Sequence, residues 1–192
     1  GYLGSVLVRP LLSRGEAVRV VDAGWFGWES IDGLACERVE GDVRTVEDGW
    51  FVSSNEPVRA VLHLAGFSND PTAEASPVLN HDVNAMGTAA IADACARVGV
   101  PRVVLASSCS VYYGSQVGDL PQTEEAVVSP TAPYSASKVQ AEWLLSRALV
   151  PRLGTAAVAL RFGTLYGPSE RMRFDLMMNR MVADAWDHGV VH

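Results

Sequence analysis

Short apolar, β-branched runs alternate along this chain with segments of helical periodicity, and this alternation constrains the fold more than any other feature. The runs predict strands at 16–22, 37–42, 58–66, 101–108 and 155–163, and the periodic segments predict helices at 4–15, 80–99 and 134–149. Apolar strands separated by helices are typical of a parallel sheet covered on both faces. The sequence therefore predicts an α/β protein with a doubly wound parallel sheet.

Composition excludes several classes of partner. The 192 residues are 48% hydrophobic and 19% charged, and the formal net charge is −7. An acidic chain without clustered Lys and Arg does not suit nucleic acid or an anionic membrane surface, and no run reaches the ~20 apolar residues of a membrane helix. The three cysteines show no metal-ligand spacing. We expect a cytoplasmic protein with free thiols and no metal.

The first residues resemble the end of a phosphate-binding loop. Gly1 and Gly4 have the spacing of the last two glycines of a dinucleotide-binding turn, and Asp22 stands at the end of the next predicted strand. An acid at that position binds the ribose hydroxyls of NAD, and it disfavours the 2′-phosphate of NADP. We therefore expect a Rossmann fold that binds NAD, with its first strand and first glycine absent from this chain.

The segment "YSASK" places Tyr134 and Lys138 four residues apart on one face of a predicted helix. In isolation such a pair is usually structural. Here "ASSCSVYYG" precedes it at the end of the strand 101–108, where an open parallel sheet faces its ligand. A serine hydroxyl could hold an alcohol oxygen while Tyr134 takes the hydroxyl proton and Lys138 lowers the pKa of the phenol. This arrangement predicts hydride transfer at a carbinol.

Over nearly its whole length, the chain resembles the extended short-chain dehydrogenase/reductase family, in its NAD-dependent sugar-nucleotide epimerase/dehydratase branch. The resemblance rests on the order of modest motifs, which are "GYLG", "VVDAGWFG", "GDVR", "HLAG", "NAMGT", "SSCSVY", "YSASK" and "LRFGTLYGP". It implies catalysis by Tyr134, Lys138 and Ser108. It implies cofactor binding by Gly1, Tyr2, Leu3, Gly4, Asp22, Asp42, Val43, Leu64, Ala65, Gly66, Tyr134, Lys138 and Gly163. It implies substrate binding by Ser108, Ser110, Tyr134, Thr164 and Asn179.

The sequence departs from one part of that branch. Relatives that eliminate water from C4 and C6 resemble "TDEVY", where this chain has Cys109 and Ser110, so 4,6-dehydration is not expected. Cys109 is either a further acid/base group or a small packed residue. Ser110 would share the face of Ser108 if the strand continued. Asn84 and His63 are expected to be structural, hydrogen-bonded side chains.

The combined prediction is an epimerase of a nucleotide sugar that oxidises one sugar carbon, C4, and returns the hydride. An isomerase is thus favoured over an oxidoreductase or a lyase. The alternatives are a dehydrogenase or reductase of a keto-sugar or another secondary alcohol, and a non-catalytic NAD sensor or scaffold. The resemblance also implies a homodimer paired through the helices 80–99 and 134–149. We expect an NAD-binding domain at 1–164 and the start of a substrate lobe at 165–192, with most of that lobe absent.

Overall fold

The computed structural model describes residues 1–54, 56–115, 121–149 and 155–191. The chain forms two compact units. The first contains 1–40 and 164–192, and the second contains 41–163. Each unit is described by itself.

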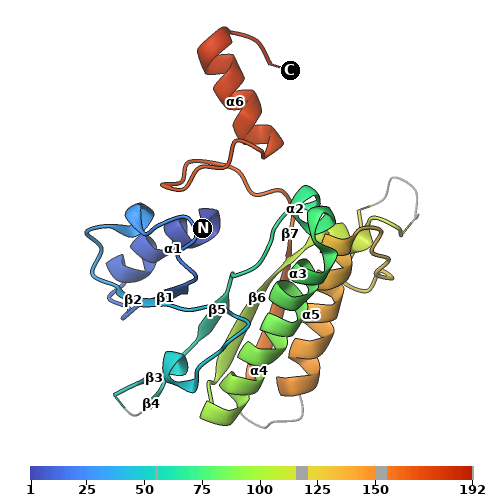
Figure 1. Ribbon diagram of the computed structural model, residues 1–192. Coiled ribbons are helices and arrows are strands. Elements are labelled where there is room, and N and C mark those ends of the chain that lie inside the picture. The colour runs from blue at the N-terminus through green and yellow to red at the C-terminus, as the bar shows by residue number, and fades with distance from the viewer. Residues whose placement is uncertain (55, 116–120, 150–154, 192) are drawn as a thin grey trace. The chain divides into compact units, whose positions relative to one another are not determined.

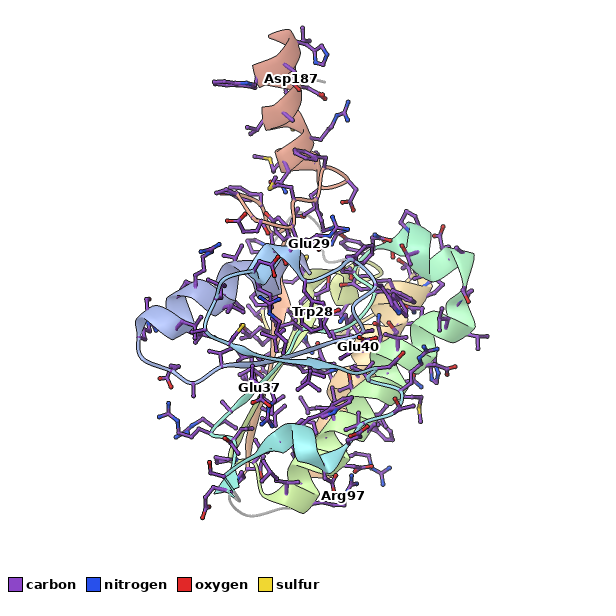
Figure 2. The ribbon with its side chains drawn as sticks, turned by 60° about the vertical axis from the view of Figure 1, so that its left-hand side comes forward. Trp28, Glu29, Glu37, Glu40, Arg97 and Asp187 are labelled. Atoms are coloured by element: carbon purple, nitrogen blue, oxygen red, sulfur yellow. The ribbon has the colours of Figure 1, made fainter. Side chains whose placement is uncertain are left out.

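The first unit begins with α1 (Tyr2–Ser13), followed by β1 (Arg19–Asp22) and β2 (Glu37–Glu40). The two strands are parallel, with Arg19 opposite Glu37 and Asp22 opposite Glu40. The short helix η1 (Glu29–Ile31) connects them, and α6 (Met177–His188) follows later in the chain. Figure 2 shows Glu37 on β2 and Asp187 on α6. Gly15, where the helix predicted at 4–15 was expected to end, follows α1 with φ +79°, in the left-handed region that favours glycine.

The second unit contains a three-stranded parallel sheet in the order β5–β6–β7 (Val61–His63, Arg102–Ser108 and Ala156–Phe162). His63, Leu105 and Ala159 stand opposite one another in this sheet. The helices α4 (Gly87–Val98) and α5 (Pro133–Leu149) lie side by side against one face of the sheet (Figure 1). The core of the unit is formed where Val103 and Leu105 of β6 meet Ala141 and Leu145 of α5, because all four are buried.

Smaller elements complete the second unit. They are η2 (Asp48–Phe51), the antiparallel pair β3 (Val52–Ser53) and β4 (Glu56–Pro57), α2 (Asp70–Ala75), α3 (Pro77–His81), a π-helical segment (Asp82–Met86) and η4 (Cys109–Tyr112). Figure 2 shows Arg97 near the end of α4, where its guanidinium lies 2.7 Å from the Asp48 carboxylate of η2. This surface ion pair joins η2 to the helix.

The predicted α/β fold with parallel strands and a Rossmann-like architecture is confirmed, with differences in detail. The predicted strands form two parallel sheets rather than one, because no described strand pairs with both β1 and β5. The strand predicted at 58–66 is only Val61–His63, since the backbone turns away at Gly66, where φ is +149°. The helix predicted at 80–99 is interrupted by the π-helical segment at 82–86. It ends, as predicted, at Gly99 with φ +87°.

Gly87 begins α4 and lets Val43 approach the helix. A Cβ added at Gly87 would lie 2.7 Å from Val43 Cγ2 and 3.0 Å from Val43 Cβ. Contacts this short cannot be relieved by a rotamer change alone, because the Cβ is attached directly to the backbone. Glycine at 87 therefore sets the position of the "GDVR" turn against α4.

We predict that Gly87→Ala lowers the free energy of unfolding by about 1–3 kcal/mol, because overpacking against Val43 outweighs the gain in helix propensity. Urea unfolding at a fixed pH measures this change. The control is Gly49→Ala, since an added Cβ there has no neighbour within 4 Å. Equal stability of the two variants would contradict this account of Gly87.

Candidate active site

The first turn of α5 carries Tyr134 and is held by local hydrogen bonds. Pro133 occupies the first helical position, where the missing N–H costs nothing. The Ser135 hydroxyl oxygen accepts from the Ala132 N–H at 3.2 Å, and the same hydroxyl donates to the Ala132 carbonyl at 3.0 Å. The first of these bonds is one half of a capping box, and Ala132 has no polar side chain to supply the other half. The sequence "APYS" therefore determines where the helix begins and where Tyr134 lies.

Lys138 is buried one turn after Tyr134. Its side chain is only 6% exposed, and its Nζ lies 5.8 Å from the centroid of the Tyr134 ring. Nζ donates to the Ala106 carbonyl of β6 at 3.0 Å. Burial lowers the pKa of Lys138 to about 8, while the carboxylate of Glu142 opposes this shift. The Lys138 amine is therefore mostly protonated at neutral pH. It forms a fixed cation beside the Tyr134 phenol.

Ser108 is the last residue of β6 and caps the turn η4. Its Oγ accepts from the Ser110 N–H at 3.2 Å and from the Ser110 hydroxyl at 2.9 Å. Within the described part of the chain, no group accepts the hydrogen of the Ser108 hydroxyl, so that hydrogen can be donated to a ligand oxygen. Ser110 lies in η4 and not on a continued strand, so its predicted position on the strand face of Ser108 is wrong. Cys109, in the same turn, is partly exposed.

Asn84 connects the loop after β5 to the first turn of α5. Its amide oxygen accepts from the Phe67 N–H at 2.8 Å, and its NH₂ group donates to the Phe67 carbonyl at 3.1 Å and to Ser137 Oγ at 3.0 Å. A Cβ on Gly66 would lie 2.5 Å from this amide oxygen, so a side chain at 66 would force the two segments apart. The predicted structural role of Asn84 is confirmed.

Asn80 is a residue that the sequence analysis missed. It donates to the Pro133 carbonyl at 3.0 Å and accepts from the Asn84 NH₂ at 2.9 Å. Asn80 and Asn84 thus hold the start of α5 together. Their four-residue spacing, which puts them on one helix face, was the available signal.

His63 is buried and neutral. Thr88 Oγ1 donates to the Asn84 carbonyl at 2.6 Å, so His63 Nε2 must be the donor in its 2.9 Å bond to Thr88 Oγ1. Burial, reinforced by the charge of Lys138, lowers the pKa of His63 to about 3. Its predicted structural role, a packed and hydrogen-bonded histidine, is confirmed.

The remaining predicted residues of the second unit lie at strand ends and turns. Leu64, Ala65 and Gly66 follow β5, and Gly163 follows β7. Asp42 is engaged by Arg44, whose Nη2 lies 2.5 Å from Asp42 Oδ2 and whose hydrogen bonds lower the pKa of the carboxyl. The structure thus places Lys138 beside Tyr134 on α5 and Ser110 beside Ser108 at η4, and α5 contacts both β6 and η4.

The first unit contains the other predicted residues. Gly1 precedes α1, which holds Tyr2, Leu3 and Gly4, and Asp22 ends β1 with its carboxylate 44% exposed. Thr164 is exposed. Asn179 of α6 is buried, where its side chain accepts from the Gly167 N–H at 2.9 Å and donates to the Arg173 carbonyl at 3.0 Å. Asn179 therefore braces its own loop, while its predicted contact with a substrate stays a prediction.

We predict that Asn84→Ala lowers the free energy of unfolding by about 3 kcal/mol, because it removes the hydrogen bonds of a buried amide to Phe67, Asn80 and Ser137. The comparison is Asn69→Ala, which removes only the exposed cap of α2 and should cost about 1 kcal/mol. Guanidinium unfolding of both variants tests the order, and a smaller loss for Asn84→Ala would refute it.

The pKa of Lys138 predicts a pH dependence of stability. The folded-state pKa of about 8 lies below the ordinary value of 10.5, so the unfolded state binds more protons between these two pH values. The stability of the wild type relative to Lys138→Met should therefore rise with pH across this window, by on the order of 3 kcal/mol. Chemical unfolding of both proteins at several pH values measures it, and parallel pH curves would exclude the shift.

None of the helices in the described residues has the length and apolar character of a membrane span. In the same residues, no group of three His, Cys, Asp or Glu side chains could hold a metal ion. Ser108, Ser110, Tyr134 and Lys138 supply hydroxyls, a phenol and an ammonium, which suit hydrogen bonding and proton transfer.

Comparison with known proteins agrees with this chemistry. Residues 1–188 match the NAD dependent epimerase/dehydratase family. The chain is 30% identical to a UDP-glucose 4-epimerase of Lacticaseibacillus casei, with 87% of this chain and 50% of the relative aligned. It is 36% identical to sterol demethylase protein B of Methylococcus capsulatus, with 74% and 42% aligned. The chain spans about half the length of these curated relatives or less.

A solved structure is similar over nearly the whole chain. It is an NAD-dependent NDP-hexosamine 5,6-dehydratase, TunA, of tunicamycin biosynthesis, with a TM-score of 0.84 and 30% identity. The similarity covers 98% of this chain and 60% of that one. The match over residues 1–188 and the shared fold lead to one conclusion. This chain belongs to the NAD-dependent epimerase/dehydratase family of enzymes.

Proposed function

We propose that the protein is an NAD-dependent epimerase of a nucleotide sugar, which oxidises the sugar at C4 and returns hydride to the opposite face. The observation that carries this proposal is that Lys138 is held as a cation beside the Tyr134 phenol by the Ala106 carbonyl of β6, the strand that ends at Ser108, whose hydroxyl hydrogen is available to a ligand. The similarity to a UDP-glucose 4-epimerase supports the substrate class.

The residues present fit NAD. Lys138 has three N–H groups, and within the described residues only the Ala106 carbonyl accepts from it, so the other two can bind ribose hydroxyls. Gly66 exposes backbone at the end of β5, and the exposed carboxylate of Asp22 suits the hydroxyls of an adenosine ribose. The predicted cofactor-binding residues Gly1, Tyr2, Leu3, Gly4, Asp42, Val43, Leu64, Ala65 and Gly163 complete this proposed site.

In the proposed reaction, bound NAD supplies the hydride acceptor and later the hydride donor. Ser108 donates a hydrogen bond to the oxygen at the reacting carbon and holds it in place. Tyr134 removes the proton from this oxygen during oxidation and returns it during reduction. Lys138 stabilises the phenolate that Tyr134 needs for the first step. Ser110, Thr164 and Asn179 are proposed to contact the substrate.

A second candidate is a dehydrogenase or reductase of a keto-sugar or another secondary alcohol. The 36% identity to sterol demethylase protein B supports this second candidate, because the name of that relative refers to a sterol and not to a sugar. The same three residues would serve either reaction. An intact set of Ser108, Tyr134 and Lys138 argues against a non-catalytic NAD sensor.

We also propose the homodimer predicted from the family resemblance. On the outer faces of the π-helical segment and α5, Met86 and Trp143 are 48% and 54% exposed, which supports pairing of these faces with a second copy. The same proposal includes an NAD-binding domain at 1–164, the start of a substrate lobe at 165–192 and a cytoplasmic location.

The first test incubates the protein at its natural full length with a panel of nucleotide sugars and no added cofactor. Sugar NMR and the absorbance of reduced nicotinamide are followed together. An isomer that accumulates over many turnovers without net NADH is the expected result, since the hydride returns to the sugar. NADH that rises to one equivalent and stops would indicate the dehydrogenase instead.

We predict that Tyr134→Phe lowers turnover by roughly 10²–10⁴-fold, because the proton acceptor is lost. NAD should stay bound, since the remaining cofactor contacts are unchanged, and equilibrium dialysis with NAD measures this. Turnover equal to the wild type would remove Tyr134 from the proposed chemistry.

A further inference from the structure

Glu142, on the proposed catalytic helix α5, forms an ion pair with Arg161 of β7. The proposed reaction does not use this ion pair. Arg161 Nη2 lies 2.7 Å from Glu142 Oε2, and Nε lies 3.0 Å from Oε1. The Glu142 side chain is 14% exposed and the Arg161 side chain is 23% exposed. Two parallel bonds define the orientation of both groups. Because removing charges from water is costly, a pair this buried requires further hydrogen bonds around it.

Those further bonds reach the strand and the turn that carry the proposed substrate anchor. Ser107, which stands opposite Arg161 in the β6–β7 register, donates its hydroxyl hydrogen to Glu142. Arg161 donates from Nη1 to the hydroxyl of Tyr112, and its guanidinium lies 5.0 Å from the centroid of the Tyr112 ring. The Glu142–Arg161 pair therefore connects α5, β6, β7 and η4.

The turn η4 is fastened at both ends. At its start, the backbone N–H and the hydroxyl of Ser110 bind Ser108 Oγ. At its end, Tyr112 is bound to Arg161, which is bound to Glu142 on the helix of Tyr134 and Lys138. The Val111 carbonyl also accepts from the Ser129 N–H at 2.9 Å and Val111 is buried, so release of Tyr112 would loosen the end of the turn without detaching it. Ser110 could then leave Ser108, whose hydroxyl hydrogen would no longer be directed toward a ligand.

We propose that the Glu142–Arg161 pair is a positioning unit that acts through Tyr112 and Ser110 to hold the Ser108 hydroxyl at a set place relative to Tyr134. The effect on catalysis rests on the proposed function, in which Ser108 binds the reacting oxygen. The hold on the turn does not rest on it. Because a misplaced anchor affects the aligned, reacting complex most, the loss should fall on kcat more than on KM.

The test is Tyr112→Phe in the protein at its natural full length, since this change removes one hydroxyl and retains the ring. We expect kcat to fall about 10- to 100-fold, as a small misplacement of a reacting group can cause. The matched control is Tyr113→Phe. Tyr113 is the adjacent tyrosine, it is 66% exposed, and within the described residues its hydroxyl forms no bond of this network. This control should retain the kcat of the wild type, and an equal fall in both variants would contradict the proposal.

A second measurement separates positioning from general destabilisation. In a Ser108→Ala background, Tyr112→Phe should change kcat by less than about twofold, because the group that it positions is already absent. A merely structural role would reduce kcat by the same factor in both backgrounds, and that result would overturn the proposal. Arg161→Lys, which retains the charge opposite Glu142 but lacks the planar fork, should reproduce the kcat loss of Tyr112→Phe.

A third measurement does not depend on any sugar. Hydrogen exchange at the Ser110 amide reports its bond to Ser108 directly. The amide should exchange faster in Tyr112→Phe than in the wild type or Tyr113→Phe, and unchanged exchange would refute the hold on the turn. A wild type that converts no nucleotide sugar while the exchange difference persists would overturn the proposed function alone.

Discussion

The buried ammonium of Lys138 is the interaction on which the arrangement of the site depends. A charge in the interior is stable only with a partner, and Lys138 finds it in the Ala106 carbonyl of β6. This bond fixes the axial position of α5 against the strand. Tyr134, one turn earlier, is thereby held near the end of β6, where Ser108 begins η4. The other contacts of the second unit adjust the position of α5 on β6 that this bond determines.

The helix α5 carries its polar residues at a spacing of four, and each contacts a different part of the unit. Tyr134 lies in the first turn of the helix, Lys138 binds β6, and Glu142 binds Arg161 of β7. Asn80 and Asn84 hold the first turn of the helix from the segment that precedes α4. Such anchoring on rigid elements is what a site for proton transfer needs, because its groups must keep their distances during the reaction.

Local sequence patterns predicted most of the helices and strands that position this site. They failed where contacts between distant residues determine the backbone conformation. The strand 101–108 and the helix from Tyr134 are present almost as predicted, because apolar periodicity and the Pro133 start are local signals. The π-helical segment at 82–86 was not predicted, since a single π-helical turn is too short to show a period of its own within the apolar pattern of the surrounding helices. The position of Ser110 was wrong because β6 stops at Ser108 to form a turn capped by that serine.

The sequence by itself determined the parallel α/β class, the Tyr134–Lys138 pair and the family, because these depend on spacing along the chain. Only the tertiary structure decided what surrounds the pair. The bond from Lys138 to Ala106, the bonds from Asn80 and Asn84 to α5 and the link from Glu142 through Arg161 to Tyr112 each join residues from different elements. Their sequence separations carry no periodic signal, so packing of α5 on the sheet had to bring them together.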